Sequence, residues 1–281
     1  MRGWMEDRPS YIPPAAIGEV MRGMTVGQVL ESNLEGYEPG DRVTGMTGWQ
    51  EFAVGDRGLG KLPDGVAPEM ALSLFGATGI TAYFGLLDIG EPKQGETVVV
   101  SGAAGATGSI AGQIARIKGC RVIGIAGGSH KCDWLLDEAR FDGAIDYKHE
   151  NVGERLSELC PNGIDIFFDN VGGPILDEVL ARIAQQARVV LCGGISHYND
   201  EGGARGPKNY FNLVLQRGRM EGFIVMDSLP RWREAIAQLG AWAAEGQLAW
   251  RVDVQQGFEN APRTFLRLFE GANVGKQLLK F

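Results

Sequence analysis

Residues 97–131 combine an apolar strand, a glycine turn and an amphipathic helix, an order that few folds accommodate. The β-branched run Val98–Val100 is typical of a buried parallel strand. A turn with Gly105 and Gly108 follows, and isoleucines then recur at positions i, i+4 and i+7, which predicts one apolar helix face. A second apolar strand ends near Ile125. Because such glycines let a pyrophosphate approach the backbone and the helix N-terminus, the segment predicts a dinucleotide-binding unit; a turn without a ligand is the alternative.

The residues after the second strand indicate which dinucleotide is bound. An NAD site usually has an acidic residue there, which holds the ribose hydroxyls. This chain continues instead as Ala126–Lys131, which contains no acid. The ammonium of Lys131 and the hydroxyl of Ser129 suit a 2′-phosphate, which a carboxylate would repel. The pattern therefore favours NADP(H) over NAD(H); the alternative is that Lys131 is a solvated lysine in the first turn of the next helix.

The composition excludes several classes of protein. The 281 residues suffice for one large or two ordinary domains, and a share of 44% hydrophobic and 22% charged residues is typical of a globular protein. A net charge of −8 disfavours a nucleic-acid-binding surface. No apolar stretch reaches the roughly 20 residues of a membrane span, and the first residues lack the apolar core of a signal peptide. We therefore expect a cytoplasmic protein without membrane or nucleic-acid partners.

The cysteines and histidines form no metal-binding pattern. No two cysteines have CxxC spacing, and no histidine completes a local ligand set with them. We therefore predict no metal site and expect reduced, mostly buried thiols. The residues concerned are Cys120, Cys132, Cys160, Cys192, His130, His149 and His197.

The pattern of the chain changes near residue 65 and again near residue 246. Residues 1–65 are rich in glycine and proline, with strands predicted at Val20–Glu31 and Asp41–Val54. Residues 68–88 are predicted to be helical, and strands and helices then alternate, which implies a doubly wound parallel sheet. The predicted strands are 97–100, 121–125, 143–146, 164–168, 188–192 and 219–226, and the predicted helices are 107–118, 130–139, 151–159, 174–183 and 231–245.

The last residues are again rich in strand patterns. Strands are predicted at 250–254 and 276–281, with a helix at 262–270 between them. A β-rich start and a returning β tail around a central α/β block predict one domain built from both chain ends, with the nucleotide-binding domain inserted between its two parts.

Eight motifs, taken in their order and spacing, resemble those of the medium-chain dehydrogenase/reductase superfamily. Within it, the chain is similar to the zinc-independent branch of alkenal double-bond reductases and prostaglandin or curcumin reductases. The motifs are Gly18–Gly23, Pro39–Val43, Thr81–Leu86, Ala104–Ser109, Phe168–Gly173, Cys192–Asn199, Arg219–Phe223 and Asn273–Lys276.

This resemblance implies a fold and an activity. The implied fold is a doubly wound Rossmann sheet, residues 81–245, inserted in a β-rich GroES-like catalytic domain formed by residues 1–80 and 246–281. The implied activity is NADPH-dependent reduction of the carbon–carbon double bond of an α,β-unsaturated ketone or aldehyde, with hydride transfer to the β-carbon. The resemblance also implies a homodimer.

The resemblance further implies a set of NADP(H) contacts, most of them in loops that follow predicted strands, where open α/β sheets bind ligands. Each residue also has a structural alternative: Tyr147 as a strand-end cap, Asn170 as a turn residue, and 223–225 as core. The implied contacts are Gly105, Ala106, Thr107 and Gly108 at the pyrophosphate; Lys131 and Tyr147 at the 2′-phosphate; Asn170; Cys192, Gly193, Gly194, Ile195, Ser196, Tyr198, Phe223, Ile224 and Val225 along the nicotinamide half; and Asn273.

Tyr198 is the candidate catalytic residue of the implied reaction. Hydride addition leaves negative charge on the substrate's carbonyl oxygen, and an enzyme must stabilise that oxygen in the transition state. A phenol keeps its proton at neutral pH and can donate the required hydrogen bond. A hydroxyl of the nicotinamide ribose is a second candidate donor, and the α-carbon proton could come from solvent. The alternative is a loop tyrosine that packs over the cofactor, and His197 beside it departs from the small or polar residue expected there.

The chain departs from the resemblance at its start. The family's catalytic domain is expected to begin several dozen residues earlier, so that Met1–Met5 matches an internal segment and a pocket tyrosine just before it has no counterpart. We therefore expect a catalytic domain that is incomplete at its N-terminus, with exposed strand edges and apolar surface. An NADPH-binding protein without this activity, and an NADPH quinone reductase, are the alternatives. A zinc alcohol dehydrogenase is a further alternative, which requires clustered ligands.

Overall fold

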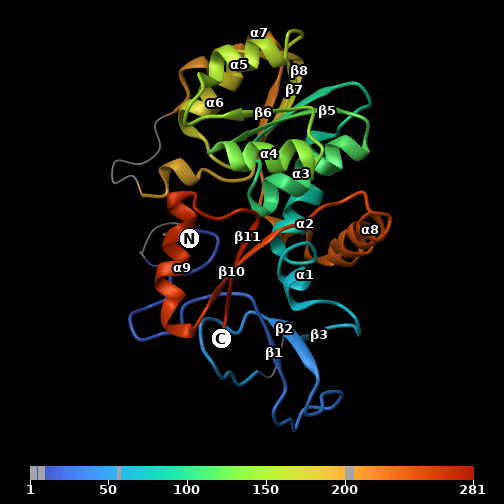
Figure 1. Ribbon diagram of the computed structural model, residues 1–281, viewed down its shortest axis with the longest axis vertical. Helices are drawn as coiled ribbons and strands as arrows, with labels where there is room; N and C mark the ends of the chain where they lie inside the picture. The colour runs from blue at the N-terminus through green and yellow to red at the C-terminus, as the bar shows by residue number, and fades with distance from the viewer. Residues whose placement is uncertain (1–4, 6–9, 56–57, 200–205) are drawn as a thin grey trace.

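A computed structural model describes residue 5 and residues 10–55, 58–199 and 206–281 (Figure 1). Its largest unit is a six-stranded sheet in which every neighbouring pair of strands is parallel. The order 6-5-4-7-8-9 reverses direction between β4 and β7, as the predicted doubly wound sheet requires. In sheet order, the strands are β6 (Gly143–Asp146), β5 (Arg121–Ala126), β4 (Thr97–Ser101), β7 (Ile164–Asp169), β8 (Ile183–Leu191) and β9 (Arg219–Gly222).

The sheet separates two apolar cores, because successive strand residues point to opposite faces. In β4, Val98 and Val100 pack in one core and Val99 in the other. In β7, Phe168 and Phe167 divide in the same way, and both are fully buried. The first core is completed by α2 (Ala77–Phe84), α3 (Ala106–Ile117), α4 (Ser129–Asp137) and α8 (Trp232–Ala244), and the second by α5 (Val152–Leu159) and α6 (Gly173–Leu180).

The N-terminal region is less regular than predicted. It forms an antiparallel sheet of β1 (Thr25–Gln28), β2 (Arg42–Gly45) and β3 (Gly60–Lys61), seen at the bottom of Figure 1. The predicted strands 20–31 and 41–54 are therefore wrong in length. Glycines at positive φ, such as Gly48 at φ 81°, turn the chain soon after β2. Of the segment Met1–Met5, which the sequence analysis matched to an internal segment of the family, only Met5 lies within the described residues.

Four other expectations need correction. The helix expected over 68–88 divides into α1 (Pro68–Leu72), α2 and a π-helical turn, η2 (Gly85–Gly90), because a turn at residues 73–76 interrupts it. The strand expected at 219–226 ends at Gly222, and Val225–Arg231 forms the 3-10 helix η5, which contains Pro230. The helix expected at 174–183 ends at Leu180, and β8 begins five residues before the strand expected at 188.

The C-terminal residues return to the middle of the molecule. The strands β10 (Val252–Gln256) and β11 (Lys276–Lys280) pair in parallel, and α9 (Ala261–Glu270) connects them. Figure 1 shows this pair between the central sheet and the β1–β3 sheet. Short helices that the sequence did not predict are η3 (Ile195–His197), η4 (Lys208–Phe211), α7 (Asn212–Leu215) and η6 (Phe258–Asn260). In the described parts of the chain, no helix combines the length and the apolar character needed to span a bilayer.

Candidate functional site

The glycine turn lies between β4 and α3, where the sequence predicted it. Gly105 is the N-cap of α3, so the first N–H groups of the helix face outward without intrahelical partners. A Cβ atom on Gly108 would lie 2.5 Å from the carbonyl oxygen of Gly102, which excludes any side chain at this position without a shift of backbone. The turn therefore provides the close backbone approach and the positive helix end that a pyrophosphate needs.

The C-terminal tail crosses this turn. Gly275 forms a parallel β-bridge with Gly105, and its N–H donates to the carbonyl of Ala104 at 2.8 Å. Gly275 has a φ of +71°, and a Cβ there would lie 2.0 Å from the carbonyl oxygen of Arg251. Asn273 donates its side-chain amide to the carbonyl of Gly275 at 2.8 Å. The structure thus brings Asn273 close to the glycine turn.

Lys131 lies at the exit of β5 and is not a solvated surface lysine. Its side chain is 8% exposed, and its Nζ donates to the carbonyl of Gly271 at 2.7 Å. Burial, and after it the charge of Lys148, lowers the pKa of the Lys131 ammonium. Two lysines therefore stand within electrostatic reach of each other, and an anion between them would relieve their repulsion.

Tyr147 and Asp146 shape the same exit. A Cβ on Gly127 would lie 2.9 Å from the Tyr147 ring, so the absence of a side chain at Gly127 lets the ring close over the end of β5. Asp146 accepts the N–H of Gly128 at 2.7 Å, which fixes the turn before α4. Tyr147 remains 44% exposed, and its hydroxyl oxygen lies as close to Gly127 as its ring does, since the same Cβ would lie 2.9 Å from it.

The exit of β7 contains a buried carboxylate that the sequence analysis did not single out. Asp169 is fully buried and accepts hydrogen bonds from the Ser101 hydroxyl at 2.6 Å and from the N–H groups of Val171 and Gly172 at 3.0 Å. Its own carbonyl accepts the N–H groups of Cys192 and Gly193. Burial raises the pKa of this carboxyl. One residue therefore connects the loops that follow β4, β7 and β8.

Asn170 is held by the same connection. Its amide donates to the carbonyl of Ser101 at 2.7 Å, and its backbone carbonyl accepts the N–H of Ile195 at 3.2 Å. Ser196 donates both its N–H and its hydroxyl to the carbonyl of Val171. The predicted residues 170 and 192–196 are thereby brought together as one wall of the site.

Tyr198 folds back against this wall. Its hydroxyl accepts the N–H of Gly194 at 3.4 Å, and a Cβ on Gly193 would lie 3.1 Å from the same oxygen. A hydroxyl that accepts one hydrogen bond still has a proton to donate. The geometry is therefore compatible with donation to a substrate oxygen.

A pocket of about 720 Å³ opens beside these loops. Five predicted cofactor contacts line it, namely Cys192, Gly193, Gly194, Phe223 and Ile224. Its lining also includes Asp169, His197, Met220 and Asp227, which were not predicted as contacts. Ile195, Ser196, Tyr198, Val225 and Asn170 are not among the lining residues.

Two predicted residues of the nicotinamide half also have structural roles. The Phe223 ring packs toward the first core, where a Cβ on Gly85 would lie 2.4 Å from it. The carbonyl of Val225 accepts the indole N–H of Trp232 at 3.2 Å.

Burial raises the pKa of the Cys192 thiol to about 12, so this thiol is neutral at physiological pH. In residues 10–55, 58–199 and 206–281, no three His, Cys, Asp or Glu side chains come close enough to hold a metal ion.

Comparison with known proteins identifies the family. The model for the N-terminal domain of oxidoreductase matches residues 1–60, and the model for zinc-binding dehydrogenase matches residues 106–241. The NADPH-dependent curcumin reductase of Escherichia coli is 43% identical over 288 residues, which covers all of this chain and 83% of that protein. The NADP(+)-dependent 2-alkenal reductase of Nicotiana tabacum is 39% identical over 274 residues, or 96% of this chain and 80% of that protein.

A solved structure agrees with these relatives. CurA from Vibrio vulnificus in complex with NADPH superposes with a TM-score of 0.94 at 44% identity, covering 99% of this chain and 85% of that one. The chain therefore belongs to the medium-chain dehydrogenase/reductase superfamily, among its NADP-dependent curcumin and alkenal reductases. The resemblance stated from the motifs is confirmed.

Proposed function

We propose that this protein is an NADPH-dependent reductase of the carbon–carbon double bond in α,β-unsaturated ketones and aldehydes. The observation that carries the proposal is the meeting of the glycine turn, the Lys131 exit and the 192–198 loop at the carboxyl ends of one parallel sheet. The names of the two relatives, a curcumin reductase and a 2-alkenal reductase, support this substrate class.

The residues at the site fit NADPH. The glycine turn leaves space that a Cβ would fill, and Gly105–Gly108 would hold the pyrophosphate at the start of α3. Lys131 and Tyr147 would hold the 2′-phosphate, since no acidic residue follows β5 directly. Asn170, the 192–196 backbone, residues 223–225 and Asn273 would line the remaining length.

Bound NADPH supplies the hydride that the reaction needs. The protein's part is to hold the enone carbonyl so that charge developing on its oxygen meets a donor. In this proposal, the Tyr198 hydroxyl is that donor, because it keeps its proton while accepting the Gly194 N–H. The pocket beside Phe223 and Met220 would receive the apolar part of the substrate.

The proposal is tested by NADPH oxidation, followed as the loss of absorbance at about 340 nm, with an enone, an alkenal, a quinone and a saturated ketone. We expect oxidation with the enone and the alkenal, formation of the saturated carbonyl compound, and no oxidation with the saturated ketone. Tight NADPH binding without oxidation would indicate a cofactor-binding protein instead. Turnover with the quinone alone would indicate a quinone reductase.

Three further assignments belong to the proposal. We assign residues 81–245 to the cofactor-binding domain and residues 1–80 and 246–281 to the catalytic domain. We also infer a homodimer, supported by the free edge of β9 and by the exposed side chains of Met226 and Leu229 near it. A cytoplasmic location is supported by four cysteines that form no disulfide. Light scattering would test the dimer.

Replacing Lys131 with methionine is expected to lower NADPH affinity about tenfold while NADH affinity changes little, since a charge-assisted hydrogen bond to the 2′-phosphate is lost. Methionine keeps the apolar stem in its buried position, so the fold is perturbed mainly at the carbonyl of Gly271. Titration of both cofactors by fluorescence measures the effect. Equal losses for both would mean that Lys131 holds only the C-terminal tail.

A further inference from the structure

Gly85 lies where α2 becomes the π-helical turn η2, and the ring of Phe223 occupies the place of its missing side chain. A Cβ on Gly85 would lie 2.4 Å from Cζ of Phe223 and 2.9 Å from Cε2 of Phe168. The φ and ψ of Gly85 are −60° and −40°, which any residue adopts. Glycine is therefore required here for space and not for backbone conformation.

Two sides of this contact are held in place. Phe168 is fully buried in β7 and packs in the first core. The end of η2 is tied to the sheet by two arginines: Arg188 of β8 donates from Nε to the carbonyl of Gly90 at 2.8 Å, and Arg219 of β9 donates to the carbonyl of Ile89. Neither Phe168 nor η2 can therefore move aside easily for a side chain at position 85.

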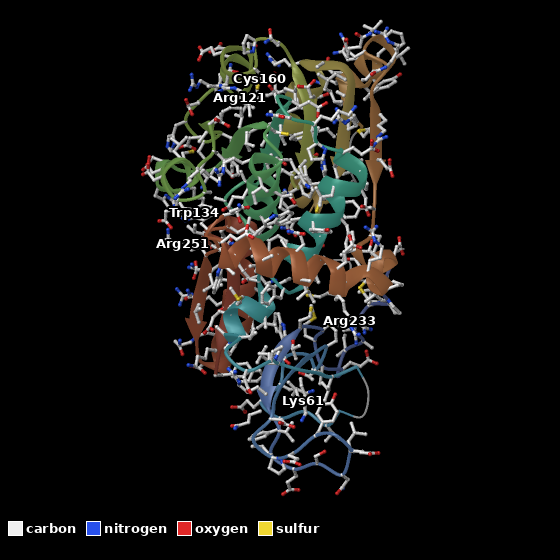
Figure 2. The ribbon with its side chains drawn as sticks, turned by 90° about the vertical axis from the view of Figure 1, so that its right-hand side faces the viewer. Lys61, Arg121, Trp134, Cys160, Arg233 and Arg251 are labelled. Carbon is white, nitrogen blue, oxygen red and sulfur yellow. The ribbon has the colours of Figure 1, made fainter. Side chains whose placement is uncertain are left out.

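Phe223 is the side of the contact that borders the pocket. It follows directly on β9, and the chain then continues through η5 into α8, whose first turn is marked by Arg233 in Figure 2. Phe223 belongs to the lining of the pocket of about 720 Å³. Because the other two sides are fixed, a side chain at position 85 would displace Phe223 at the expense of pocket space.

The pocket itself suits a bulky apolar group. Leu176, Leu191 and Met220 line it together with Phe223. Its volume is within the range of pockets that enclose drug-sized ligands, and such pockets are lined mainly by apolar side chains. An aryl group attached to the conjugated system of a substrate would find both room and apolar contacts there.

We infer that Gly85 is a positioning residue that sets the size of the enone that the pocket accepts. It acts through Phe223, whose ring it allows to withdraw from the pocket, and it touches no substrate itself. The inference rests on the proposed function and narrows its substrate class to include enones with a bulky aryl group.

The test compares two substrates in Gly85→Ala by steady-state kinetics. Chalcone has an aryl group on each side of its enone, whereas 3-buten-2-one has no group larger than methyl. We expect the ratio of kcat/KM for chalcone to kcat/KM for 3-buten-2-one to fall about tenfold, mainly through KM of chalcone, since one methylene of pocket space is worth about 10- to 200-fold. Both substrates use the same cofactor, so a change in NADPH binding cancels in the ratio.

Gly90→Ala is the matched control, because it makes the same change at the other end of η2. A Cβ there would lie 3.3 Å from Leu86 and 3.4 Å from Ile166, neither of which lines the pocket. This variant should keep the wild-type ratio.

Two further variants separate a steric effect from a disturbed fold. Gly85→Ala combined with Phe223→Leu leaves room for the added methyl group and should restore the ratio toward the wild-type value. Phe223→Trp keeps Gly85 and overfills the same contact from the other side. It should lower the ratio as well, and it tests the inference if Gly85→Ala is unstable.

Three results would overturn the inference: an unchanged ratio in Gly85→Ala, an equal fall in Gly90→Ala, or a wild-type protein that reduces 3-buten-2-one but not chalcone. These failures differ from failure of the proposed function, which would be a wild-type protein that reduces neither enone. In that case, calorimetric titration of the NADPH-loaded wild type and Gly85→Ala with chalcone still tests the inference, because only the wild type should bind it well.

Discussion

Tyr198→Phe is expected to lower kcat for an enone about 100-fold, the loss typical of removing one hydrogen-bond donor from a developing oxyanion. The substitution removes one oxygen and leaves the ring, so the 195–198 turn should keep its conformation. The N–H of Gly194 loses a long hydrogen bond of 3.4 Å, which is a small change. NADPH affinity should therefore change little, and the effect should appear in kcat more than in the dissociation constant of the cofactor.

Tyr210→Phe provides the control for this experiment. Tyr210 is 59% exposed in η4, it belongs to none of the predicted site loops, and the same atom is removed there. Stopped-flow measurement of NADPH oxidation in a single turnover would report the chemical step for both variants. If Tyr198→Phe reduced the enone as fast as Tyr210→Phe, Tyr198 would have only a packing role and the donor would have to be found elsewhere.

The central sheet was predictable because its strands are buried on both faces. Such strands are continuous apolar runs, as in Val98–Val100, and the turns between them carry glycine or asparagine. The predicted strand 143–146 coincides with β6, and β4, β5 and β7 agree within one residue at each end. Local patterns and the final fold agree in this region, so the sequence alone was sufficient.

The regions around the sheet were less predictable because contacts between distant segments decide them. The strand expected at 219–226 stops at Gly222. Beyond it, the carbonyl of Val225 accepts the indole N–H of Trp232 and is therefore not paired with a neighbouring strand. The π-helical turn at residues 85–90 brings Gly85 under the Phe223 ring, a contact between residues 138 positions apart (223 minus 85). The parallel pairing of β10 and β11 likewise depends on α9 folding between them.

In the candidate site, too, some features follow from the local sequence and others depend on contacts between distant segments. The positions of the glycine turn, the Lys131 exit and the 192–198 loop follow from the strand-exit rule, which applies to any open α/β sheet. Burial of Lys131 could not be foreseen, because it depends on Gly271 at the other end of the chain. Asp169 could have been recognised, since an acid that ends an apolar strand and precedes Asn-Val-Gly-Gly has several N–H groups within reach.

Gly108→Ala is expected to lower NADPH affinity about tenfold to a hundredfold, because forcing one methyl group into a filled space costs roughly 1–3 kcal/mol. The added Cβ would lie 2.5 Å from the carbonyl oxygen of Gly102 and 3.0 Å from the Cα of Ala103. Both are backbone atoms next to β4, so they cannot rotate away as a flexible side chain would. The start of α3 must therefore move relative to the strand, and its N–H groups move with it.

Gly27→Ala is the control, because a Cβ on Gly27 in β1 would meet no atom within 4 Å. Both variants should be titrated with NADPH and melted with and without the cofactor. The expected result is a reduced affinity and a smaller NADPH-induced rise in Tm for Gly108→Ala alone, since a ligand stabilises the folded state according to its affinity. Equal NADPH affinity in the two variants would mean that α3 can shift without losing the diphosphate, and that the fit at Gly108 serves helix packing instead of cofactor binding.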